Sequence, residues 1–180
     1  MTGQLFLDKS RYYLKTEYPA KIRLAVQDLS YEDVWRRANE DSNSIGNLIV
    51  HLAGNIRQWI VAGIGGEASD RDRAAEFAMR NGPPLPELLT LLDTAIRDVD
   101  RVLSSLRDED LILDKTIQGR QTNVLAAIYH VVEHFSMHTG QIILMAKEYA
   151  PGSVKFYDNA GGNAVPLWGG GEGMPASRTR

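Results

Sequence analysis

The residues best suited to chemistry in this 180-residue chain are its four histidines. Three of them, His130, His134 and His138, are spaced four residues apart, which places them in one row on the face of a helix. The fourth, His51, lies in the apolar stretch NLIVHLAGN. Neutral imidazole is a common protein ligand for zinc, nickel or ferrous iron. The pattern therefore indicates a metal site formed by His51 and two histidines of the row.

Spacing alone leaves open which two histidines of the row take part. The row extends about 12 Å along its helix, because each of eight residues adds about 1.5 Å. One ion therefore cannot reach both His130 and His138, and the one left over has another role, as a ligand's partner, a general base or a surface residue. Three histidine ligands would leave a coordination position for water or substrate. Asn47 and Asn55, one turn either side of His51, are candidates to orient its ring or a bound water.

Composition and charge narrow the class of protein further. The chain has no cysteine, which excludes disulfides, thiolate ligands and a thiolate nucleophile, so any metal must be bound by nitrogen and oxygen. A formal net charge of −3 without a basic block gives no support for a nucleic-acid partner. The chain has neither an apolar run of membrane-spanning length nor a secretory signal pattern, so we expect no membrane partner and a cytoplasmic location. Because no Glu is followed by His three positions later, the di-iron carboxylate pattern is excluded.

Four long amphipathic segments must position these histidines. Apolar residues recur at helical intervals in each of them, which predicts an all-α protein. Long helices are predicted over residues 4–29, 44–62, 85–106 and 122–149. Ser44 and Thr122 are the expected N-caps of the two helices that carry histidines, and Pro19 is expected to kink or divide the first helix.

The connections between these segments are expected to be long. Short helices are predicted over residues 31–36 and 70–79, and an extended excursion or hairpin over 111–120. Residues 1–150 are expected to form one bundle. Residues 151–180 are rich in glycine, and we expect an irregular tail that packs, with Trp168 as its one large anchor, on the bundle or on a partner subunit.

The two histidine segments together are similar to a known family. SIGNLIVHLAGN and HVVEHFSMHTGQI resemble the DinB-like superfamily of four-helix metal-binding proteins. That family pairs a histidine in the middle of its second helix with an H-x-x-x-H pair on its fourth, just before a Gly-Gln. Gly140-Gln141 occupies that position here, so the resemblance implies His51, His134 and His138 as the metal ligands.

The resemblance covers about residues 4–150 and has wider implications. It implies a four-helix bundle that binds a divalent metal, zinc or nickel first and iron or manganese as alternatives, and that forms a homodimer. Relatives transfer low-molecular-weight thiols or isomerise maleylpyruvate with a thiol cofactor. His130 falls where the family often has a histidine that is not a ligand, and Thr139 stands where the family frequently has arginine.

Two hypotheses about function follow. The first is a metal-dependent transferase, or a related hydrolase or isomerase, that brings together a small-molecule thiol and an electrophile, with His130 and Gln141 as candidates for acid–base help or hydrogen-bond donation. The second is a non-catalytic, metal-stabilised helical dimer that binds a ligand or a partner. The sequence feature that favours the second is the lack of a clear carboxylate acid or base beside the histidines.

Overall fold

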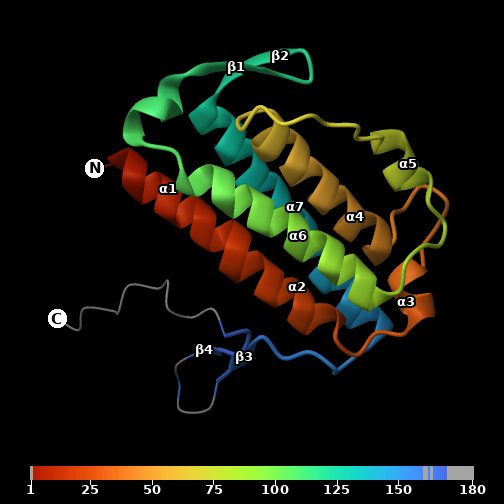
Figure 1. The fold of residues 1–180 in the computed structure, drawn as a ribbon. Helices are drawn as coiled ribbons and strands as arrows, with labels where there is room; N and C mark the ends of the chain where they lie inside the picture. The colour runs from red at the N-terminus through yellow and green to blue at the C-terminus, as the bar shows by residue number, and fades with distance from the viewer. Residues whose placement is uncertain (1, 160–161, 163, 170–180) are drawn as a thin grey trace.

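The computed structural model describes residues 2–159, 162 and 164–169, and most of them lie in α-helices (Figure 1). The prediction of an all-α protein is therefore confirmed. Four long helical segments lie alongside one another, and two of them include a π-helical stretch. The segments are α1 (Thr2–Tyr12) with η1 (Tyr13–Glu17) and α2 (Tyr18–Val26); α4 (Ile45–Ile56) with η2 (Arg57–Ala62); α6 (Leu85–Ser104); and α7 (Val124–Tyr149).

Shorter elements lie in the connections between these segments and after α7. They are the helices α3 (Tyr31–Trp35), α5 (Arg73–Ala78) and the 3₁₀ helix η3 (Asp108–Ile112), and the strand pairs β1 (Asp114–Ile117) with β2 (Arg120–Asn123) and β3 (Tyr157–Asp158) with β4 (Val165–Pro166). The β1–β2 hairpin confirms an extended excursion or hairpin in this connection, but over residues 114–123 rather than the predicted 111–120. Its two-residue turn, Gln118-Gly119, has positive φ at both positions, as tight hairpin turns require.

Local capping sets where the two histidine-bearing helices begin. The Ser44 hydroxyl accepts a hydrogen bond from the N–H of Asn47, whose side-chain oxygen accepts one from the N–H of Ser44, so the predicted cap of α4 is confirmed. The predicted cap of α7 is wrong by one residue. Thr122 is paired in β2, and Asn123 caps the helix by accepting from the N–H of Ala126 at 2.8 Å.

A kink or a division was expected at Pro19, and the first helix changes to a π-helical turn there without a break in the helical segment. Proline has no N–H to donate, so a regular α-helix would lose one hydrogen bond here and meet a steric clash. The chain instead widens into the π-helical turn η1 directly before it, in which the Tyr18 N–H bonds to the carbonyl of Tyr13. The irregularity that Pro19 requires is thus absorbed within one continuous helical segment.

The four segments pack in a closed ring around one core. α2 contacts α7, α7 contacts α4, α4 contacts α6, and α6 contacts α1. Fully buried side chains such as Leu52 on α4 and Phe135 on α7 fill the centre. α4 and α7 are antiparallel, as Figure 1 shows. Among the described residues, no helix is both long and apolar enough to cross a membrane.

The chain beyond α7 returns to the first helix. The indole N–H of Trp168 donates to the carboxylate of Glu17 at 3.0 Å, and the ammonium group of Lys21 lies 4.4 Å from the centre of the Trp168 ring. Trp168 therefore contacts the first helical segment at Glu17 and Lys21. Residues 170–180 of the predicted tail lie outside the described residues.

Candidate metal centre

His51, His134 and His138 meet between α4 and α7, although 83 residues separate His51 from His134. One ring nitrogen of each lies within 4.8 Å of the other two. His51 and His138 are buried and His134 is half-buried. Tetrahedral zinc with Zn–N distances of about 2.0–2.1 Å needs nitrogens about 3.3 Å apart. Small side-chain adjustments would therefore bring all three nitrogens to one ion.

The histidine left out of this cluster is His130. Its ring lies against Trp59, with centroids 4.3 Å apart, and stacks on the ring of His134, with centroids 5.5 Å apart. His130 lies one turn before His134 and two turns before His138 on α7. An ion bound to His138 is therefore too far along the helix axis to be bound by His130 as well. Burial lowers the pKa of His130, so the ring is neutral near pH 7.

His51 contacts a carboxylate, that of Glu76, which was not predicted from the sequence. Glu76 Oε2 lies 2.9 Å from Nδ1 of His51, and the Arg71 guanidinium donates to both oxygens of Glu76, at 2.6 and 2.7 Å. Burial acts to raise the pKa of Glu76, but the hydrogen bonds from Arg71 and His51 outweigh it and hold the pKa below its ordinary value. The ionised carboxylate accepts from Nδ1–H, which leaves Nε2 of His51 available to a metal.

The expectation that no carboxylate lies beside the histidines is therefore wrong. Glu76 belongs to α5, a short helix in a connection, and nothing in the sequence spacing ties it to His51. Gly54 is the residue that permits the contact, since a Cβ there would collide with the Glu76 carboxylate and lie 2.8 Å from Nε of Arg71. A glycine inside an apolar helix, one turn after the histidine, was the available signal.

The two asparagines flanking His51 do not orient its ring. Asn47 caps α4, and its amide nitrogen donates to the backbone carbonyls of Glu76 at 2.8 Å and Met79 at 2.9 Å. It therefore holds α5 in place and acts on His51 only through Glu76. Asn55 is buried, and its side-chain oxygen has no hydrogen-bond partner among the described residues.

His138 also has a hydrogen-bond acceptor for its Nδ1–H. Nδ1 of His138 lies 2.6 Å from Oε1 of Gln141, one turn further along α7. Because the amide oxygen can only accept, Nδ1–H is the donor, and Nε2 of His138 carries the free lone pair. Gln141 was expected as a donor, but toward His138 it is an acceptor that fixes the tautomer.

The environments of His134 and His138 favour the neutral imidazole, which is the form that binds metal. Burial and the neighbouring rings of His138 and His51 lower the pKa of His134 to about 3. Burial also lowers the pKa of His138, partly opposed by the hydrogen bond from its ring to Gln141. Three converging ring nitrogens, with the tautomers of His51 and His138 fixed by hydrogen bonds, fit a divalent cation.

Comparison with known proteins places the chain in a family. Residues 1–157 match a family described as "Protein of unknown function (DUF1572)". The chain belongs to this family. The matched region includes all four long helical segments and every residue of the histidine cluster. No curated protein matches the chain.

Proposed function

We propose that this protein binds one divalent metal ion through His51, His134 and His138. The observation that carries the proposal is the convergence of their nitrogens within 4.8 Å, with Nδ1 of His51 and of His138 each held by an oxygen acceptor. These hydrogen bonds orient Nε2 of His51 on α4 and Nε2 of His138 on α7 as metal ligands. Buried polar atoms need partners, and a bound metal ion would be a partner for both. This ligand set supports assignment of the chain to the DinB-like type of four-helix bundle.

The donor set favours zinc or nickel among the common divalent ions. Three imidazoles without thiolate suit both metals, whereas iron and manganese more often add a carboxylate ligand. The carboxylate nearest the site, Glu76, is already engaged by Arg71 and His51 and so acts on the site through the His51 ring. A three-histidine set leaves one position of a tetrahedral ion for water or substrate.

We further propose transfer of a low-molecular-weight thiol to an electrophile as the reaction. A divalent ion in this site would act as a Lewis acid and lower the pKa of a bound water or thiol. The chain has no cysteine, so the attacking sulfur must come from a small molecule. In the transfer the thiol loses its proton, the sulfur forms a bond to the electrophilic carbon, and the leaving group departs with its electron pair. His130, neutral and one turn from His134, is the candidate to take that proton.

Elemental analysis of protein purified without a metal-affinity tag tests the metal proposal. We expect about one ion per chain in the wild type and loss of it in His51→Ala, His134→Ala and His138→Ala. His130→Ala is the matched control on the same helix and should keep its ion. Circular dichroism shows whether each variant is folded. A folded wild type without stoichiometric metal, or equal loss from His130→Ala, would overturn the ligand assignment.

A second function, a metal-stabilised helical homodimer without catalysis, is favoured by one surface feature. Tyr129, Met137 and Leu144 lie on one stripe of α7 and are 63%, 47% and 59% exposed. Gly140 lies between them, and a Cβ at this position would meet no other atom within 4 Å. A helix with an open, apolar face of this kind suits packing against a second copy of itself.

Stability and turnover separate the two functions. In the second, chelation of the metal lowers the midpoint of thermal unfolding strongly, and no thiol-dependent turnover appears with a panel of alkylating and aryl electrophiles. In the first, the metal-loaded protein consumes thiol, and the rate falls in the three histidine variants. Loss of thiol, measured with a chromogenic disulfide reagent, is the direct assay.

A further inference from the structure

The side-chain oxygen of Asn55 is a buried acceptor without a partner. Asn55 is 5% exposed, and its Oδ1 accepts no hydrogen bond from any described residue. The other buried side-chain atom that lacks a partner among the described residues is Nε of Arg37, which is a donor. An unpaired buried acceptor costs free energy of folding, unless a bound molecule donates to it. Oδ1 of Asn55 is therefore a candidate contact for a ligand.

Contacts one turn to either side place Asn55 against α7. Asn55 follows His51 by four residues and precedes Trp59 by four, so the three lie on one stripe of the continuous segment formed by α4 and η2. The Nε2 atoms of His51 and His134 are 2.9 Å apart. The rings of Trp59 and His130 have centroids 4.3 Å apart. Asn55 lies between these two contacts, and therefore beside the row of histidines at the level of His134 and His130.

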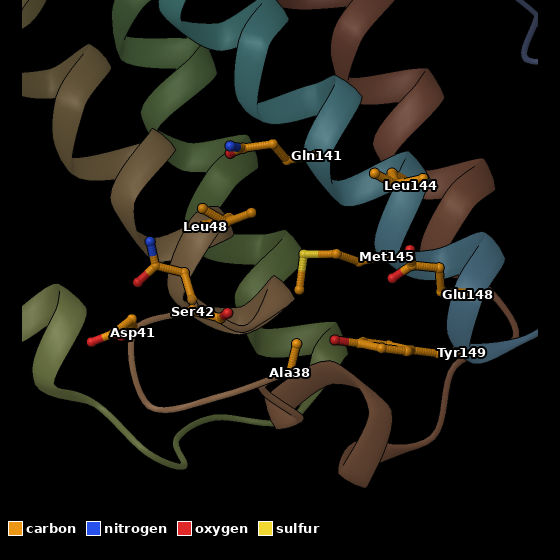
Figure 2. Close-up of a pocket in the computed structure, with 10 residues that line it drawn as sticks. Ala38, Asp41, Ser42, Leu48, Gln141, Leu144, Met145, Glu148 and Tyr149 are labelled. Atoms are coloured by element: carbon orange, nitrogen blue, oxygen red, sulfur yellow. The ribbon is translucent and has the colours of Figure 1, made fainter.

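The other end of the cluster leads to a pocket that does not reach the ligand nitrogens. This pocket, of about 320 Å³, lies between the beginning of α4 and the last turns of α7 (Figure 2). None of the three candidate ligands lines it. Gln141 does, but its Oε1 already accepts from Nδ1 of His138. His134, in contrast, is half-buried, so solvent reaches the cluster at the level of Asn55.

An unpaired amide oxygen discriminates between ligands. It has lone pairs and no hydrogen, so it attracts an O–H, N–H or S–H group and repels the lone pairs of an anion. We propose that Oδ1 of Asn55 accepts a hydrogen bond from the ligand that fills the position left open by the three histidines. This ligand is neutral and carries a proton on its bound atom, as water, an alcohol or a thiol does. Asn55 is a positioning residue in this role, and the role rests on the proposed metal function.

Anion binding to the Co²⁺-loaded protein tests this selectivity, because the visible spectrum of Co²⁺ changes with its ligands. Azide is the probe, since it has lone pairs and no proton. Asn55→Leu removes the acceptor and nearly keeps the volume of the side chain. We expect azide to bind this variant about threefold to tenfold more tightly than the wild type, a change of the size of one net hydrogen bond. Equal azide affinity in the two proteins would overturn the inference.

A neutral probe should respond in the opposite direction. Trifluoroethanol carries a proton on its oxygen, and the relaxation of its fluorine nuclei by Co²⁺ reports weak binding. We expect Asn55→Leu to weaken its binding, because the hydrogen bond to Oδ1 is lost. A variant that binds both probes more tightly would show only that the site has become more open, and would refute the selectivity.

Two further substitutions of Asn55 guard against misfolding of the first. Asn55→Ala also removes the acceptor and should also bind azide more tightly. Asn55→Asp keeps an acceptor oxygen and should not. Thr139→Val is the matched control, because Thr139 is a buried polar residue beside His138 whose hydroxyl donates to the carbonyl of Phe135 at 2.8 Å. An equal gain in azide affinity from Thr139→Val would show a general effect of lost polarity and refute the role of Asn55.

Metal content, measured in every protein, separates this inference from the proposed function. A folded wild type without bound metal refutes the proposed function and this inference with it. A wild type that holds the ion, with azide affinity unchanged in Asn55→Leu, refutes the inference alone. Loss of the ion from a folded Asn55→Leu protein would show that the amide oxygen is itself a metal ligand, which also refutes the role proposed for it.

Discussion

Glu76→Gln is the substitution that most directly tests how the candidate metal centre is held. It keeps the shape of the side chain and one acceptor oxygen for Nδ1 of His51. It removes the negative charge that the hydrogen bond of 2.9 Å and the Arg71 guanidinium both use. The ring of His51 would then become a weaker ligand and a less firmly oriented one.

The size of the effect can be estimated from these contacts. Loss of a carboxylate that orients a ligating histidine weakens metal binding by about 10- to 100-fold, or about 1.4–2.7 kcal/mol. The folded protein is affected as well, because the Arg71 side chain is only 6% exposed and loses its charged partner. Breaking a buried ion pair costs about 3–5 kcal/mol. We expect the lower end, since Nη1 of Arg71 keeps a hydrogen bond of 2.7 Å to Gln58.

Two measurements are needed. Competition with a chromogenic chelator gives the zinc affinity, and urea unfolding of the metal-free protein gives the stability. Glu67→Gln is the control, because this carboxylate pairs with Arg101 at an exposed site, where such pairs contribute about 0–1 kcal/mol.

Gly54→Ala tests the same contact in a second way. The Cβ of alanine would displace the Glu76 carboxylate from His51 without changing any charge. A folded Glu76→Gln protein with wild-type zinc affinity would refute the role assigned to the carboxylate.

Three further predictions concern the fold and its assembly. Hydrogen bonds from Arg11 and Lys15 outweigh burial and lower the pKa of Asp100, so this pairing stabilises the folded state above the ordinary carboxyl pKa and is lost as pH falls below it. Asp100→Asn should therefore cost less than about 1 kcal/mol at pH 7, and its urea unfolding curves should converge with the wild type once the pH is below the lowered pKa of Asp100; a constant gap would contradict this. Phe135→Ala removes a fully buried ring stacked on Tyr18 and should cost about 3–5 kcal/mol in urea unfolding, so a loss under 1 kcal/mol would show that the core there is loosely packed. If α7 forms a homodimer face, Met137→Glu should convert the dimer to monomer in light scattering, and an unchanged mass would exclude this face.

Signals close together in the sequence predicted most of the architecture. Apolar periodicity located the four long helices, and the reciprocal Ser44–Asn47 cap fixed the start of α4. Such signals work because their interactions join residues three or four positions apart, so no knowledge of the tertiary structure is needed. The error at Thr122 was one of position only, since both Thr122 and Asn123 pair in β2 and it is the Asn123 side chain that accepts from the N–H of Ala126.

The same distinction between local and long-range interactions applies to the candidate site. The row of three histidines on α7 could be derived from spacing, and resemblance selected His134 and His138 from it. The convergence of these two with His51 depends on the packing of α4 against α7. Neither Glu76 nor the exclusion of His130 from the cluster was derivable from spacing alone.

The sequence by itself determined the helices, the set of imidazoles and the absence of thiolate chemistry. Only the tertiary structure decided that Glu76 and Arg71 lie against His51 and that Gln141 accepts from His138. The physical reason is range. Helix periodicity and capping act over a few residues, whereas hydrogen-bond partners and burial depend on which distant segments pack together. Burial is also what lowers the pKa values of His134 and His138.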